Sequence, residues 1–318
     1  MDLYRSSKVT LVEVVDAVTP QMESYIKLRG ERRKTGLKTA EVLKGKIEQK
    51  LHALGNFAYA RMHYGEYFTS ASRQAYITFD FVDAEDAAAR MPFRKVVGQT
   101  LRDPETLIAS WWAYSELGKA MRLRGEIPMD RPSCPAFYCL WGSPKPDLEA
   151  YERLFVQKAA PQKAALKEVL ENDSLPSNRA AAVYLLSYVP ESMTALSAAY
   201  AALTDPDETV RAAGLQVLAD VAVYHKDVAL DLGKVIALLD YPSTLDRSRA
   251  LEVLSGLADR EGYREPMIRR AGARIISLLK LNQPANHDRA YTLLVIISKE
   301  SFDRRDYKAW ESWLRTQE

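Results

Sequence analysis

One nine-residue stretch decides the fold that the sequence predicts: Asp205-Pro206-Asp207-Glu208-Thr209-Val210-Arg211-Ala212-Ala213. A proline-containing turn is followed by residues typical of a helix start, and Arg-Ala falls in the first turn of that helix. Three further sites place Arg-Ala a few residues after a proline, at Arg179, Arg249 and Arg289, so that successive arginines are 32, 38 and 40 residues apart. This spacing indicates repeated helix pairs.

The residues around these sites support a buried helix face. Four residues after each arginine comes an apolar side chain: Val183, Leu215, Val253 and Leu293. The first helices of the pairs are expected near residues 162–171, 191–203, 227–239 and 265–280. Each pair has an apolar face that it cannot bury alone, so neighbouring pairs stack and share a core.

The period, the stretch 205–213 and the later Leu218 resemble HEAT repeats, which build α-solenoids. The resemblance implies that the repeated arginines form a ladder of hydrogen bonds with acidic residues of the adjoining turns. We interpret these residues as structural. The candidate ladder consists of Arg179, Arg211, Arg249, Arg289, Asp205, Asp246 and Asp288.

Residues 1–92 carry the strand signals. Residues 57–68 are rich in aromatic residues, and apolar and polar residues alternate over 75–82, which predicts a half-buried strand. The polar residues 69–72 between them are short enough to close an antiparallel hairpin. A helix is predicted over 39–54.

Two upstream segments complete this small α+β domain. Residues 9–18 fit a strand or a short helix, and residues 25–28 fit a short strand before Gly30. A short strand, a helix ending Leu51-His52-Ala53-Leu54-Gly55-Asn56-Phe57 and two closing strands resemble the polypeptide-transport-associated (POTRA) modules of outer-membrane assembly machinery. Those modules place two helices between their first two strands, whereas the sequence predicts one. An unrelated hairpin packed on a helix is the alternative.

The middle of the chain links these parts. A helix is predicted from Asp103 to about Arg124, and five prolines within residues 127–147 exclude regular structure there. Aromatic side chains in that segment favour a strap lying on the protein. The chain therefore divides into an α+β domain (1–92), a connecting helix (93–126), a strap (127–147) and an α-solenoid (148–318), a mainly α fold.

The strap holds the two cysteines of the chain, Cys134 and Cys139. They are candidates for a disulfide, which would add about 2 kcal/mol and would persist in an oxidising compartment. The alternative is a pair of buried thiols in the cytosol.

Motifs for chemistry are not found in the sequence. The four histidines are scattered, and metal-binding, phosphate-loop and nucleophile-elbow spacings are lacking, so we predict no catalytic, cofactor-binding or metal residues. Residues 151–318 hold 22 basic and 23 acidic residues, a net charge of −1. A neutral solenoid binds nucleic acid poorly, because phosphate binding needs clustered cations. We therefore do not expect nucleic acid as a partner.

The chain has no run of eighteen apolar residues and its first thirty residues lack the pattern of a secretory signal. A start at Met1-Asp2 also fits a chain whose leader has been removed. The whole chain is similar to uncharacterised bacterial HEAT-repeat proteins with an α+β leader domain and a Cys-containing strap, many with export signals. This implies a periplasmic or otherwise exported protein if a leader was removed, and a cytoplasmic one otherwise.

The function that these features predict is a noncatalytic adaptor or scaffold that binds a protein partner through the solenoid surface, for example at an envelope complex. The alternative is an enzyme on a HEAT scaffold, such as a DNA glycosylase or a chromophore lyase. The oligomeric state stays open.

Overall fold

The computed structural model describes residues 1–4, 8–31, 34–68, 73–128 and 134–317. Over these residues the protein is mainly helical, with one three-stranded sheet. It divides into two compact units: unit 1 is Met1–Pro92, Leu239–Ser248 and Ala271–Glu318, and unit 2 is Phe93–Leu238 and Arg249–Arg270. Part of the expected domain 148–318 therefore belongs to the same unit as residues 1–92.

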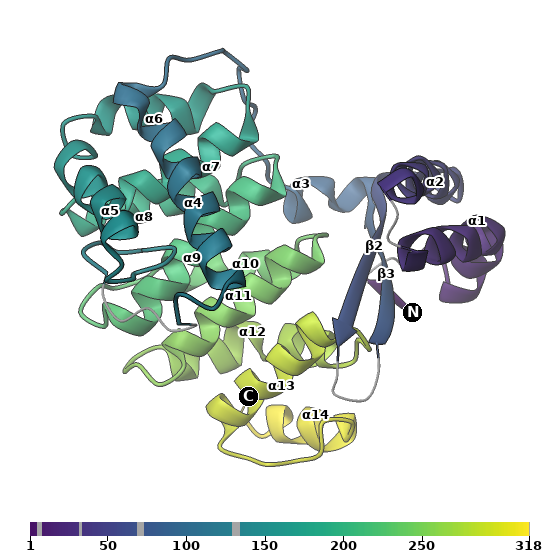
Figure 1. Ribbon diagram of the computed structural model, residues 1–318. Coiled ribbons are helices and arrows are strands. Elements are labelled where there is room, and N and C mark those ends of the chain that lie inside the picture. The colour runs from purple at the N-terminus through teal and green to yellow at the C-terminus, as the bar shows by residue number, and fades with distance from the viewer. Residues whose placement is uncertain (5–7, 32–33, 69–72, 129–133, 318) are drawn as a thin grey trace. The chain divides into compact units, whose positions relative to one another are not determined.

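Unit 1 begins with an α+β arrangement in the order β1, α1, α2, β2, β3 (Figure 1). The strand order is β1-β3-β2, with β1 parallel and β2 antiparallel to β3. The expected connection at residues 69–72 lies outside the described residues. The elements are β1 (Asp2–Tyr4), α1 (Leu11–Glu31), α2 (Lys34–Ala53), β2 (Phe57–Phe68) and β3 (Arg73–Asp83).

The short strand expected at residues 25–28 is wrong, because these residues lie inside helix α1. The reason is a helical stripe that begins well before them. Val14, Val18, Met22 and Tyr25 are buried at helical spacing, so one continuous helix covers the core.

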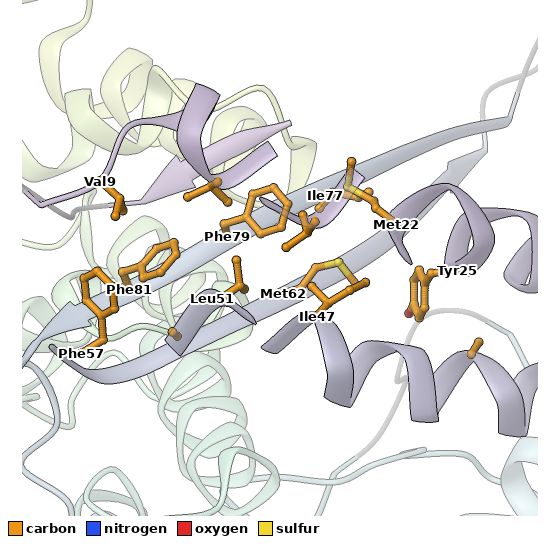
Figure 2. Close-up of a cluster of buried hydrophobic side chains, with 14 residues drawn as sticks. Val9, Met22, Tyr25, Ile47, Leu51, Phe57, Met62, Ile77, Phe79 and Phe81 are labelled. Atoms are coloured by element: carbon orange, nitrogen blue, oxygen red, sulfur yellow. The ribbon is translucent and has the colours of Figure 1, made fainter. Parts of the chain in front are cut away.

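The core of this arrangement lies between the hairpin β2–β3 and the helices (Figure 2). Phe79 and Phe81 of β3 and Met62 of β2 lie close to Ile47 and Leu51 of α2. Alternate residues of β3 supply this face, as the period of a strand requires.

From Thr78 onward the other face of β3 is also buried, which corrects the prediction of a half-buried strand for this part of it. Thr78 and Asp80 on that face have almost no exposed surface. Asp80 pairs there with Arg247, and the carboxylate of Asp2 in β1 accepts hydrogen bonds of 2.9 Å from the backbone N–H groups of Asn282 and Gln283. Later residues of unit 1 therefore cover the face that we expected to meet water.

Short helical segments and the later helices complete unit 1, and α11 and α12 each contribute residues to both units. The segments are η1 (Ala84–Asp86), α3 (Ala87–Arg90), η3 (Leu238–Asp240), α11 (Thr244–Leu257), α12 (Arg264–Leu279), α13 (Pro284–Ser298) and α14 (Tyr307–Arg315).

Unit 2 is built from helices that pack on one another. Helix α6 packs on α7, α8 on α9, and α7 on α9, while α4 packs on α5 and α7. The helices are α4 (Leu107–Leu123), α5 (Pro146–Lys158), α6 (Lys163–Asn172), α7 (Pro176–Leu186), α8 (Ser192–Ala202), α9 (Glu208–Tyr224) and α10 (Leu232–Ala237).

The connecting helix α4 starts four residues later than the sequence predicts. A 3₁₀ turn, η2 (Pro104–Thr106), precedes it, with positive φ angles of 48° at Glu105 and 59° at Thr106. The Asp103 carboxylate nevertheless accepts hydrogen bonds of 2.9 Å from the backbone N–H groups of Ile108 and Ala109. Asp103 thus accepts hydrogen bonds from backbone N–H groups that have no partner inside the first turn of α4, although η2 lies between them.

Candidate functional site

The expected ladder begins with a buried pair in unit 2. Arg179 donates to both carboxylate oxygens of Asp205, over 2.8 and 2.7 Å. Its Nη1 also donates to the carbonyl oxygens of Asp173 and Ser174, six and five residues earlier. Arg94 donates to the same Asp205 carboxylate over 2.7 Å. Asp205 is therefore bonded to two guanidinium groups.

Arg211 repeats the backbone part of this arrangement. Its Nη1 donates to the carbonyl oxygens of Asp205 and Pro206, again six and five residues earlier, over 2.9 and 3.0 Å. Like Arg179 in α7, Arg211 is the fourth residue of its helix, α9. The bonds tie the first turn of each helix to the turn before it.

In the third pair the equivalent residue is Arg247, two positions before the predicted Arg249. Arg247 is the fourth residue of α11, and its Nη1 donates to the carbonyl oxygens of Tyr241 and Pro242 over 2.9 and 2.8 Å. Arg249 instead forms an ion pair with Glu252 one turn along the same helix. The physical reason is rotation: residues two apart on a helix point about 200° apart, so only one can face inward.

The fourth site also departs from the expected contacts. The fourth residue of α13 is His287, whose Nδ1 lies 2.7 Å from the carbonyl oxygen of Leu279. The predicted Asp288 is exposed and lies 3.4 Å from Arg304. Arg289 is half-buried beside it.

The remaining predicted residue, Asp246, is buried in the first turn of α11. Its neighbour Arg247 faces a different carboxylate. Arg247 Nη2 lies 2.9 Å from Asp80 Oδ1, and both side chains are fully buried. Burial raises the pKa of Asp80 to about 6, against the opposing effect of Arg247 and Arg90. His63 Nε2 lies 3.3 Å from Asp80 Oδ2. This closed cluster joins elements of unit 1 and is not open to a ligand.

The strap packs its aromatic side chains inside unit 2. Tyr138 stacks on Tyr184 of α7, with ring centroids 5.0 Å apart. Trp141 Nε1 donates to the carbonyl oxygen of Tyr114 in α4 over 3.1 Å. A Cβ atom on Gly118 would lie 2.2 Å from Trp141 Nε1, so glycine leaves the space that the indole occupies.

Cys134 and Cys139 are joined by a disulfide in the structure. Cys139 is buried, whereas Cys134 lies at the surface. Residues 129–133 of the expected strap lie outside the described residues.

A cavity of about 440 Å³ lies beside this disulfide. It is lined by Cys134, Pro135, Glu149, Glu152, Arg153, Val156 and Gln157. Its most unusual wall residue is Glu152, which is only 3% exposed. Glu152 Oε1 accepts hydrogen bonds from the Tyr114 hydroxyl and, over 3.2 Å, from the backbone N–H of Gly142. Burial raises the pKa of this carboxyl, against the opposing effect of the two hydrogen bonds.

A second cavity, of about 480 Å³, lies at the carboxyl ends of α9 and α11. Two consecutive large apolar residues are exposed at this cavity. Val223 lines it, and the next residue, Tyr224, is 67% exposed. The other wall residues are Lys226, Ser255, Gly256, Asp259, Arg260, Glu261 and Tyr263.

Among the described residues, no three His, Cys, Asp or Glu side chains gather in a way that could hold a metal ion. No helix within the described ranges is both long enough and apolar enough to span a membrane. Comparison with protein-family models, curated proteins and solved structures finds no match to the chain.

Arg247 and Glu152 are not among the residues predicted from the sequence, although each has a signal there. Arg247 follows Thr244 at the same helical position that Arg211 holds after Glu208. Glu152 stands between Leu148 and Phe155 at helical spacing, so a carboxylate interrupts an apolar stripe. A charge at such a position must find buried partners or face a cavity.

Proposed function

We propose that the protein is a noncatalytic protein-binding scaffold whose helix pairs are HEAT-like repeats. One observation carries this proposal: Arg179, Arg211 and Arg247 each stand fourth in their helices and each donate to the carbonyls six and five residues earlier. The same device at successive pairs is what a repeated structural unit requires. Stacked repeats expose extended surfaces on which macromolecules bind.

The cavity at the ends of α9 and α11 is the surface that we propose for the partner. Tyrosine is enriched among residues that dominate binding energies, and here Tyr224 stands exposed beside a hollow. Lys226, Asp259 and Arg260 surround the apolar side chains with charge. An apolar centre with a charged rim is the usual anatomy of a protein interface.

Unit 1 supports an assignment to an envelope complex. Two helices, α1 and α2, lie between strands β1 and β2, as in the POTRA modules that the sequence resembles. We therefore propose that this arrangement is POTRA-like and that the scaffold acts in the periplasm.

The test is affinity capture from cells with the full chain and two variants. Tyr224→Ala removes the proposed anchor, and Met193→Ala on α8 is the control, since Met193 is 71% exposed but does not line this cavity. Proteins enriched by the wild type and by Met193→Ala should fall about thirtyfold with Tyr224→Ala, the effect of losing about 2 kcal/mol. Equal capture by all three, or turnover of a substrate that depends on a carboxylate or histidine, contradicts the proposal.

A further inference from the structure

The cavity beside the disulfide carries an inference that is independent of the scaffold function. We propose that it is a binding site for a small organic cation, a protonated amine attached to an apolar body, with Glu152 as the residue that recognises the charge. The cavity volume of about 440 Å³ lies within the range of small-molecule sites.

The state of the Glu152 carboxylate is the first argument. The residue is only 3% exposed, and both of its hydrogen bonds end on Oε1. Among the described residues no donor is bonded to Oε2, although the residue lines the cavity. The second carboxylate oxygen is therefore left to the cavity that Glu152 lines, and a ligand that brings an N–H donor and a positive charge can form a charge-assisted hydrogen bond with it.

The charges around the cavity are the second argument. Glu149 and Arg153 also line it, but they form an ion pair with each other, 3.2 Å apart, and so balance. Glu152 has no cationic partner among the described residues, which leaves the wall with a net charge of −1. An anionic ligand would be repelled, and a cation would be attracted.

The remaining wall selects the ligand's body. Cys134, Pro135 and Val156 present apolar surface, and the walls of small-molecule sites are mostly apolar. The disulfide joins Cys134 to the buried Cys139, so the wall is covalently held to the interior of unit 2. A phenyl or indole group fits this surface, and a purely polar cation does not use it.

The positioning of Glu152 fits a binding role. The Tyr114 hydroxyl and the Gly142 N–H hold one oxygen in place, so the other is oriented before a ligand arrives. Such preorganisation reduces the entropy lost on binding.

The experiment is calorimetric titration of the full chain with three probes of similar size: 2-phenylethylamine, 2-phenylethanol and 3-phenylpropionate. The amine should bind at least tenfold more tightly than the neutral and anionic probes. Equal binding of the amine and the alcohol overturns the proposal, as does no binding of the amine at millimolar concentration.

Two variants locate the site. Glu152→Gln keeps the acceptor for Tyr114 but removes the charge, and it should weaken amine binding at least tenfold. The control is Glu168→Gln, the same change at an exposed carboxylate of α6 that does not line this cavity, and it should leave binding unchanged. Val156→Trp fills the cavity and leaves the Glu152 carboxylate in the chain, so it tests the site even if Glu152→Gln does not fold. Unchanged amine affinity in Val156→Trp places the binding elsewhere and overturns the proposal.

Discussion

The guanidinium of Arg179 and the carboxylate of Asp205 form two parallel hydrogen bonds of 2.8 and 2.7 Å, and both side chains are buried. The two residues are 26 positions apart and belong to successive helix pairs. Paired geometry of this kind is among the stronger contacts that a protein makes, because both charges are desolvated and fully bonded. The bond thus joins one pair to the next.

Arginine substitutions should show which arginines stabilise the fold through the buried hydrogen bonds. The structure gives this role to Arg247, whereas the sequence predicts it for Arg249. Arg179→Met and Arg247→Met each leave a buried carboxylate with fewer partners, and we expect a loss of about 3–5 kcal/mol in the free energy of unfolding. Arg249→Met breaks a half-exposed pair with Glu252 and should cost less than about 1 kcal/mol.

Urea unfolding of the full chain, followed by circular dichroism, measures these differences. Arg94 remains bonded to Asp205 in Arg179→Met, so the loss there should lie at the lower end of the range. If Arg249→Met lowered the free energy of unfolding as much as Arg247→Met, the assignment of Arg247 as the inward-facing arginine would be contradicted.

The buried Asp80 should make the stability of unit 1 depend on pH. Its pKa is raised from 3.8 to about 6, so the folded state binds more protons than the unfolded state between these values. The free energy of unfolding contributed by this group is therefore highest at low pH and is lost as the pH rises from about 4 to about 6. Asp80→Asn should remove this slope in urea unfolding measured across the range.

The groups around Asp80 define the control for this measurement. Arg247 and Arg90 lower the pKa of Asp80, and the Nε2 atom of His63 lies 3.3 Å from the Oδ2 atom of Asp80. The comparison is therefore made in a His63→Gln background. A slope that survives Asp80→Asn there would rule out Asp80 as its source.

Two glycine substitutions should change the stability of the protein in opposite directions. In Gly118→Ala the new methyl group meets the Trp141 indole at 2.2 Å, and the overpacking should destabilise unit 2 by about 1–3 kcal/mol or more. Gly45 in α2 has no atom within 4 Å of the position of a Cβ, so Gly45→Ala should stabilise the protein by about 0.4–1 kcal/mol. Thermal unfolding of both variants checks the contrast, and stabilisation by Gly118→Ala would mean that Trp141 does not lie against α4.

Loss of the disulfide should lower stability by a modest amount. Replacing Cys134 and Cys139 with serine opens a short ring, for which the loop-entropy estimate gives about 2 kcal/mol. Urea unfolding of the double variant and of oxidised wild type gives the difference. Alkylation of both thiols in unreduced protein from its native compartment would show instead that the bond does not form there.

Helix pairs were predictable because their signals are local. A proline turn, a cap and an apolar stripe lie within about twenty residues, and the helix expected at 265–280 is found at Arg264–Leu279. The strands at 57–68 and 75–82 were predictable for the same reason, since alternation is read along one segment. A strand at 25–28 was predicted wrongly because a window of four residues cannot show a stripe that begins at Val14.

The candidate site was less predictable, because its members are chosen by distant partners. Arg247 and Arg249 stand two apart beside the same turn, and the sequence alone cannot say which of them meets Asp80 of β3, 167 positions earlier. Likewise, the role of Glu152 depends on distant segments. Tyr114 donates a hydrogen bond to one of its oxygens, and Cys134 and Pro135 of the strap form part of the cavity that it lines.

The sequence by itself determined most of the helices and the strands at 57–68 and 75–82, because backbone preferences and side-chain periodicity act between near neighbours. Only the tertiary structure decided which arginine of each helix start turns inward, that both faces of β3 are covered, and that residues 239–248 and 271–318 belong with residues 1–92 in unit 1. Those outcomes depend on the burial and pairing of charges between segments far apart in the chain, and the free energy of a buried charge is set by the partners that folding brings to it.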